Sequence, residues 1–231
     1  MRTPRSHPRL RAAGLATAGV LALTGCADVP PGAASVVNGH TITRAQVDQL
    51  ADAQCAGVAL AARQGQGQVV ARKQLTQRAL GLLIDIQLNL DFARSLELEP
   101  RPTKAAADFA QVTPLIDTLP TKYQPYLKNV FRRWADGRDM LTQLGENASG
   151  QAATQANAEQ ILNEGYAQRQ TWLTKNADID TSSIYSPGKV GWPGEGDSSV
   201  SQPVSSFAKS AASAQPSTAF LSGLPAGQRC G

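Results

Sequence analysis

The chain has 231 residues, enough for one domain with tails, and its net charge of +4 comes from 22 basic and 18 acidic side chains. The first 25 residues hold four arginines and no acidic residue, so the remainder carries 22 − 4 = 18 basic and 18 acidic side chains and is neutral. A neutral chain with 5% aromatic residues lacks the basic surface and the stacking side chains of a nucleic-acid-binding protein.

Residues 1–25 have the pattern of an export signal peptide. A cationic stretch, "MRTPRSHPRLR", precedes the apolar run "AAGLATAGVLAL", which is too short to span a bilayer as a helix. The two arginines nearest the start are separated by Thr3-Pro4, so a twin-arginine signal is not indicated. We therefore expect the mature protein to lie outside the cytoplasm.

Leu23-Thr24-Gly25-Cys26 resembles the lipobox of bacterial lipoproteins. The resemblance implies cleavage between Gly25 and Cys26, a diacylglyceryl group on the Cys26 sulfur, and fatty acids such as palmitate at the new N-terminus. Several acyl chains on one residue make a stable anchor, which would hold the protein on the outer, extracytoplasmic face of the cell membrane. Residues 26–34 are rich in proline and small residues, which predicts a flexible tether. An ordinary secretory signal with an unrelated cysteine is the alternative.

A β-hairpin followed by a capped helix is predicted next. Asn38-Gly39 lies between β-branched residues, which favours a type I′ turn joining strands at 35–37 and 40–43. Thr43 is the expected N-cap of a helix at 44–63, and Gln46 three residues later completes a capping box. Apolar residues at helical spacing predict its buried face: Val47, Leu50, Ala51, Cys55, Val58 and Ala62.

Hydrophobic periodicity predicts four more helices, at about 69–98, 103–112, 121–144 and 155–176. Pro114 should end the second of these, and "GENASGQ" should link the last two. A short strand at 183–185 should pair with the first strand near Ile184. From residue 193 the chain is dominated by Gly, Ser, Ala, Pro and Gln, so we expect 193–231 to be largely disordered. The predicted fold is one mainly α domain over 35–192, with a small N-terminal hairpin and a late pairing strand.

The sequence contains little that points to catalysis. Of its two histidines, His7 is in the signal peptide and His40 adjoins the turn, where exposure to solvent is the plain interpretation. No Cys, His and Asp cluster has the spacing of metal ligands, and no glycine loop suits a phosphate. Asp85 and Asp91 are expected to be solvated charges. We expect no enzyme activity and no cofactor.

The charged stretch "FRRWADGRD" at 131–139 has two interpretations. It is either a half-buried helix whose Arg132, Arg133 and Asp136 face water, which we favour, or a contact for anionic lipid or a partner.

The stretch "ASVVNGHTITRAQVDQL" resembles the start of the SurA/PrsA-type chaperone N-terminal domain. The matching residues are Val36, Val37, Asn38, Gly39, Ile42, Thr43 and Val47. The long helix after a glutamine-rich loop, the "PRPT" break and the late helix before an extended segment also fit, as do Pro187-Gly188 and "SSVSQPVSS" near the end of the match over 34–206. Many relatives carry a parvulin-type isomerase domain, for which this chain has no space between its helices.

The resemblance implies an isomerase-less actinobacterial-type lipoprotein that acts as a holdase, binding unfolded or exported polypeptides in an apolar groove. The side chains expected to line that groove are Leu82, Ile86, Leu90, Phe131 and Trp134, although the same residues could form the domain's own core. A structural or adaptor lipoprotein that binds one envelope partner is the main alternative, and a degenerate prolyl isomerase is a weaker one.

Two cysteines remain if Cys26 is lipidated. Cys55 is in the first predicted helix and Cys230 is the penultimate residue. An even number of thiols in an oxidising location suggests a disulfide that would pin the tail across this helix. A buried Cys55 with a free or intermolecularly paired Cys230 is equally consistent with the sequence.

Overall fold

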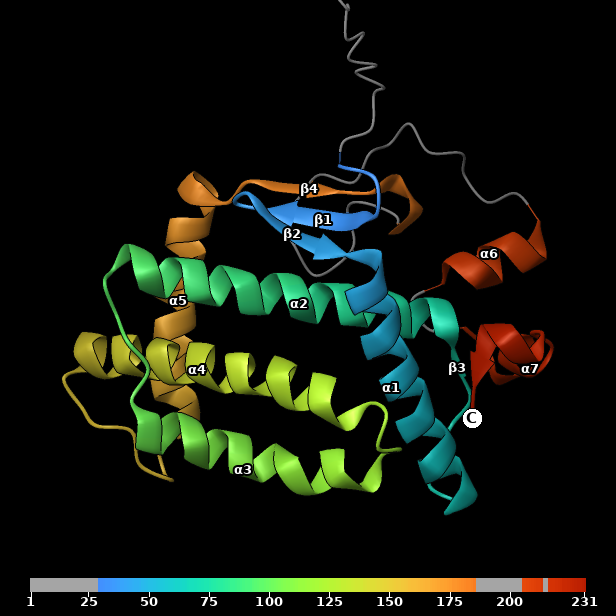
Figure 1. Ribbon diagram of the computed structural model, residues 1–231, viewed down its shortest axis with the longest axis horizontal. Coiled ribbons are helices and arrows are strands. Elements are labelled where there is room, and N and C mark those ends of the chain that lie inside the picture. The colour runs from blue at the N-terminus through green and yellow to red at the C-terminus, as the bar shows by residue number, and fades with distance from the viewer. Residues whose placement is uncertain (1–28, 186–204, 214–215) are drawn as a thin grey trace, which may run out of the picture.

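The computed structural model of the chain describes residues 29–185, 205–213 and 216–231 (Figure 1). Cys26, Pro187 and Gly188 lie outside the described residues. The elements in chain order are β1 (Ala33–Val37), β2 (His40–Thr43), α1 (Arg44–Arg63), β3 (Val70–Ala71), α2 (Arg72–Ser95), α3 (Pro102–Thr118), α4 (Gln124–Ser149), α5 (Ala158–Asn176), β4 (Ile179–Thr181), η1 (Ser183–Tyr185), α6 (Ser206–Ala212), α7 (Thr218–Ser222), η2 (Ala226–Gln228) and β5 (Arg229–Cys230).

The predicted fold class is confirmed: the protein is mainly helical, with a small N-terminal hairpin and a late pairing strand. Asn38 and Gly39 both have positive φ, at 47° and 81°, as a type I′ turn between β1 and β2 requires. The late strand pairs antiparallel with β1, but it is β4, a few residues earlier than predicted. Residues 183–185 form a 3₁₀ turn instead, and Ile184 is 60% exposed.

The start of α1 also follows the prediction. The Thr43 hydroxyl accepts a hydrogen bond from the Gln46 main-chain N–H, and the Gln46 side chain accepts one from the Thr43 N–H at 2.8 Å. Ile42 and Val47, on either side of the cap, are both buried. Hairpin, cap and helix therefore form one locally encoded unit.

The helices form successive layers beneath the sheet. In Figure 1 the sheet lies on α2, α2 lies on α4, and α3 is on the side farthest from the sheet. Helix α5 packs along α4, and α1 packs against α2. The main core contains Val47 and Leu50 of α1, Leu80 and Leu88 of α2, and Val130 of α4. The wide buried face of α2 agrees with the expectation that this helix is contacted on more than one side.

Several predicted boundaries are wrong. Val70 and Ala71 pair with β5 as a strand, so α2 begins later than residue 69. Helix α3 begins at Pro102 and continues past Pro114. Pro114 removes one main-chain hydrogen-bond donor, but the helix goes on and buries Ile116 in its last turn. The stretch 145–149, expected to be a linker, belongs to α4, which ends at Gly150 with φ 66°.

Both ends of the domain contain more structure than expected. Val29 is 7% exposed, Pro30 accepts a hydrogen bond from the Ala33 N–H, and Ala34 is fully buried, so 29–34 is not a flexible tether. In the tail, the described residues form α6, α7, η2 and β5. The expectation of a largely disordered tail is wrong for residues 205–213 and 216–231, because α6 packs on α7 and the segment 216–231 packs on the domain and pairs with β3.

Candidate functional site

The side chains expected to line an apolar groove lie in the main core or pack against it. Ile86 is 1% exposed and belongs to the main core, so its assignment to a groove is wrong. The other four candidates are partly buried and pack against this same core: Leu82, Leu90, Phe131 and Trp134. The rings of Phe131 and Trp134 also contact each other edge to face, with centroids 6.2 Å apart. These side chains hold α2 and α4 together, which was the alternative interpretation of the same pattern.

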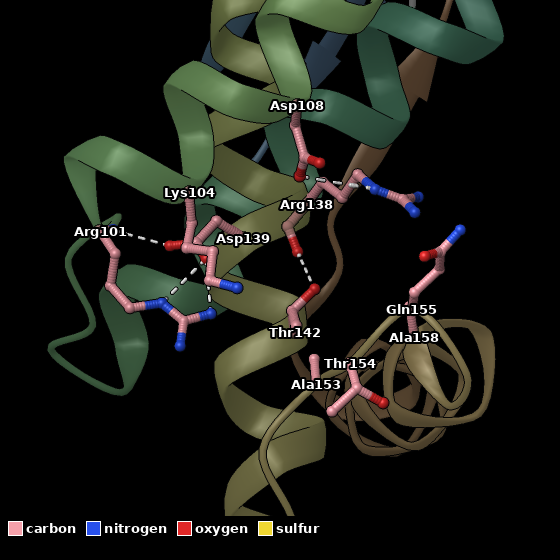
Figure 2. A pocket seen from close by; sticks show the side chains of 10 residues that line it. All are labelled: Arg101, Lys104, Asp108, Arg138, Asp139, Thr142, Ala153, Thr154, Gln155 and Ala158. Atoms are coloured by element: carbon pink, nitrogen blue, oxygen red, sulfur yellow. Dashed lines mark hydrogen bonds and ion pairs between the residues drawn. The ribbon is translucent and has the colours of Figure 1, made fainter.

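A polar cavity of about 310 Å³ lies where α3 begins, beside α4 and the segment leading into α5 (Figure 2). Its lining is dominated by charged and hydroxyl-bearing side chains: Arg101, Lys104, Asp108, Arg138, Asp139, Thr142, Ala153, Thr154, Gln155 and Ala158. Arg138 and Gln155 point toward one another from opposite sides. None of the lining residues is a histidine or a cysteine.

A buried charge network forms the floor of this cavity. Asp139 is 2% exposed and accepts hydrogen bonds from the Arg101 main-chain N–H at 2.7 Å and from Arg101 Nη2 at 2.6 Å. Arg101 Nη1 donates to Glu146 Oε2 at 2.6 Å, and Glu146 Oε1 accepts from the Ala153 N–H at 2.8 Å. The hydrogen bond to Asp139 raises the pKa of the Arg101 guanidinium. The network thus joins the start of α3, the C-terminal half of α4 and the loop before α5.

The charges around the cavity largely satisfy one another. Arg138 Nε lies 3.6 Å from Asp108 Oδ2, and the Arg138 guanidinium lies over the Trp134 ring. Burial raises the pKa of Asp108, against the opposing effect of Arg138. These contacts brace α3 against α4. Arg101 and Asp139 were not predicted as site residues, because charged side chains are normally solvated.

Asp91 is not the solvated charge that was expected, whereas the Asp85 side chain is 38% exposed and stays partly solvated. Asp91 is mostly buried and accepts hydrogen bonds from Asn38 Nδ2 at 3.2 Å and Gln87 Nε2 at 2.8 Å. Asp85 receives one at 2.5 Å from Arg169, which is 5% exposed. His40 lies at the hairpin turn with its side chain 55% exposed, and its Nε2 is 3.8 Å from Asp91. These contacts attach the hairpin and α5 to α2.

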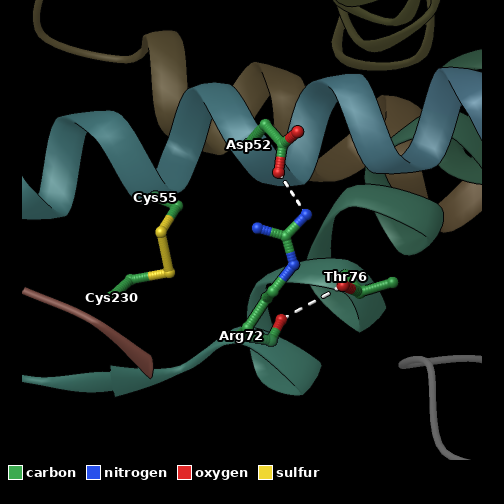
Figure 3. Close-up of a disulfide and its surroundings, with 5 residues drawn as sticks. All are labelled: Asp52, Cys55, Arg72, Thr76 and Cys230. Atoms are coloured by element: carbon green, nitrogen blue, oxygen red, sulfur yellow. Dashed lines mark hydrogen bonds and ion pairs between the residues drawn. A yellow bond between two sulfur atoms is a disulfide. The ribbon is translucent and has the colours of Figure 1, made fainter. Parts of the chain in front are cut away.

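The two remaining cysteines form a disulfide, which decides between the two interpretations left open above (Figure 3). Cys55 of α1 is bonded to Cys230 of β5, 175 residues apart in sequence. Beside it, Arg72 at the start of α2 forms an ion pair with Asp52 of α1. Strand β5 pairs antiparallel with β3, where Cys230 faces Val70 and Arg229 faces Ala71. The last residues therefore lie as an extended segment along β3 and against α1.

Among the residues that the structure describes, no helix has both the length and the apolar character to cross a membrane, and no three His, Cys, Asp or Glu side chains gather as metal ligands. A scan against protein-family models, a search of curated proteins and a search of solved structures each found no match to this chain.

Proposed function

We propose that the chain is an extracytoplasmic polypeptide-binding lipoprotein, a holdase without catalytic chemistry, held on the outer face of the cell membrane by the lipid on Cys26. The observation that carries the proposal is strand β5, residues 229–230, which lies extended along β3 with the Cys230 side chain 2% exposed against α1. Main-chain pairing at a strand edge is one of the ways in which proteins bind an extended peptide.

Main-chain pairing suits a binder of many clients because every polypeptide offers the same N–H and C=O groups. Affinity then comes from the apolar area that the client buries, at roughly 25 cal/mol per Å² before the cost of ordering the client. Cys55, Val58 and Val70 are partly buried apolar residues at the edge of the main core, next to the position of Cys230. They supply the apolar surface beneath the strand.

The start of the described chain supports a close attachment to the membrane. Val29 is buried, and only two residues lie between it and Cys26. The three Cα-to-Cα steps from Cys26 to Val29 span at most about 11 Å, so a lipid on Cys26 would hold the sheet end of the domain near the headgroups. Helix α3, on the opposite side of the bundle in Figure 1, would then face away from the membrane.

One observation favours the adaptor function as a second candidate. The outer face of α3 carries no charge over almost three turns, and its exposed residues there are Ala106, Ala107, Ala110, Gln111, Pro114 and Leu115. Leu115 is 68% exposed. Such a face suits a helix of one specific envelope partner, because small side chains let a second helix approach closely.

A client assay tests the proposal. The protein used is residues 26–231 with Cys26→Ser, which retains every described residue and leaves only Cys55 and Cys230 as cysteines. We expect this chain, at stoichiometric amounts, to suppress aggregation of several unrelated unfolded proteins in its disulfide-bonded form, its reduced form, or both. No suppression by either form would refute the holdase. Crosslinking in intact cells to a single partner, lost with Leu115→Glu and kept with exposed Gln49→Glu, would establish the adaptor instead.

Intact mass of the protein extracted from membranes tests the anchor separately. We expect the mass of a chain that begins at a lipidated Cys26, and an uncleaved or released protein without the diacylglyceryl group from Cys26→Ser. An unmodified Cys26 in the mature chain would refute the anchor and leave the client-binding proposal standing.

A further inference from the structure

Apart from its disulfide, the C-terminal segment 216–231 is attached to the domain only by short non-covalent contacts, among them those of β5 with α1 and of η2 with α2. Strand β5 pairs with β3 over two residues. A small separate cluster, formed by Leu221 and Leu224 with Ala71, holds the preceding turn. Within the segment, the Ser217 hydroxyl caps α7, and Arg229 Nη1 donates to the Ser222 carbonyl at 2.6 Å. These last two bonds shape the segment itself and do not attach it to the domain.

The domain surface beneath the segment is continuous with the main core. Cys230 is part of the main core cluster, together with residues of α1 and α2. The main chain of Gly231 lies so close to the domain that a Cβ added there would be 3.3 Å from the Gln68 carbonyl oxygen and 3.4 Å from Val58 Cγ1. The edge of β3 and the adjoining face of α1 thus form a place fitted to an extended main chain, with room for one small side chain at the position of Cys230. We call it the β3 site.

We propose that the β3 site is the client-binding site, that it accepts an extended segment of another polypeptide, and that the Cys55–Cys230 disulfide keeps it closed with the chain's own C-terminus. A dithiol reductant opens it. The two thiols of the reductant are oxidised to a disulfide, and their two electrons and two protons reduce the Cys55–Cys230 disulfide to two free thiols. The segment is then held by the two-residue ladder, the small apolar cluster and the packing of β5 on α1 and of η2 on α2, without a covalent bond, and a client strand competes with it. This inference rests on the proposed function for its ligand.

The main test measures binding of a probe that imitates the bound segment. The probe is a fluorescent peptide with the sequence of residues 224–231 and serine in place of cysteine, so that it cannot form a disulfide. We expect it to bind the 26–231 chain at least tenfold more tightly when Cys230→Ser is introduced, or after reduction, than when the disulfide is intact. Equal binding to the open and closed forms, or no binding to the open form, would overturn the inference.

A matched pair of variants locates the binding. In the open form, Val58→Glu places a charge beneath the strand and should weaken probe binding at least tenfold. Gln49→Glu adds the same charge at an exposed position on the opposite face of α1 and should leave binding unchanged. Circular dichroism establishes that both variants fold. If Val58→Glu folds and binds like its control, the peptide does not use the β3 site.

Hydrogen exchange tests the opening without any ligand. Amides of 216–231 should lose most of their protection on reduction, while those of α2 keep theirs. Unchanged protection in the segment would overturn the closure by disulfide. The proposed function can fail separately. If the open form binds the probe but neither form suppresses aggregation, the β3 site is supported and the holdase function is refuted. If both forms suppress aggregation equally, the holdase function is supported and closure of the site by the disulfide is refuted.

Discussion

The two interfaces on either side of α4 are held by different physical means. Toward α5, the helices meet main chain to main chain: a Cβ added at Gly145 would be 1.7 Å from the Ile161 carbonyl oxygen, and one added at Gly165 would be 2.0 Å from the Leu141 carbonyl oxygen. Toward α3, the contact contains the buried Arg101–Asp139 pair and the polar cavity. The first interface depends on shape and has no room for one added carbon, whereas the second depends on charge and can accept other atoms at a cost in free energy.

The largest expected effect is at the α4–α5 interface. Gly165→Ala forces a methyl group onto the Leu141 carbonyl, and main chain cannot move aside as a flexible side chain can. We expect a loss of about 3 kcal/mol or more in the free energy of unfolding, measured by urea denaturation. Gly57→Ala in α1 is the control: its Cβ would be 3.6 Å from Leu119 Cδ2, and alanine favours helix by about 1 kcal/mol. A wild-type midpoint for Gly165→Ala would show that α4 and α5 do not touch in this way.

The α3–α4 interface should respond differently to loss of each partner of its ion pair. Arg101→Gln leaves Asp139, 2% exposed, without its cation, and should cost about 3 kcal/mol. Asp139→Asn leaves Arg101, 34% exposed, able to turn toward water, and should cost about 1–2 kcal/mol. Thermal and urea unfolding of the two variants give this order. The reverse order would mean that Asp139 is not the more deeply desolvated partner.

Acidity should distinguish the charged interface further. Burial raises the pKa of Asp108 above its ordinary 3.8, so at a pH between the two values the folded chain binds more protons than the unfolded chain. This group's contribution to the free energy of unfolding therefore rises as pH falls through the raised pKa, and it is complete below 3.8. Asp108→Asn should remove this contribution. Urea midpoints of both proteins between pH 7 and about 4 measure the difference, and parallel curves would contradict it.

The smallest effect is expected at the exposed edge of the same interface. Lys128 Nζ lies 2.8 Å from Asp117 Oδ1, but both side chains are well exposed to solvent. Lys128→Met should change the free energy of unfolding by about 0.5 kcal/mol or less. A loss as large as that of Arg101→Gln would mean that exposed and buried pairs contribute alike to this interface.

Local features of the chain were predictable to different degrees. The hairpin, the Thr43 cap and the whole of α1 follow from neighbouring residues, because turn, cap and helix each depend on contacts a few positions apart. The end of α4 was placed too early because Gly145 reads as a helix breaker. A glycine within a helical pattern can also mark a close helix contact, and that signal was available at Gly145 and Gly165.

The candidate site was less predictable than the fold. The apolar pattern that suggested a groove at Leu82, Ile86 and Leu90 is the same pattern that a core helix needs, and burial alone separates the two. The Arg101–Asp139 pair joins residues 38 positions apart, so no local sequence pattern predicts it. The ordered tail was missed because its composition is that of a disordered segment, while its order comes from Cys55, Val70 and Ala71 far earlier in the chain.

The sequence by itself determined the helical class, the hairpin with its type I′ turn, the capped first helix and the presence of two cysteines able to pair, because these depend on short-range periodicity, turn chemistry and composition. Only the tertiary structure decided which apolar faces are core, that the two cysteines are joined, that Asp139 is buried against Arg101, and that the last residues form a strand on β3. Each of these features depends on contacts between residues distant in sequence. The free energy of such a contact depends on the surroundings of the side chains in three dimensions, which the spacing of residues along the sequence does not specify.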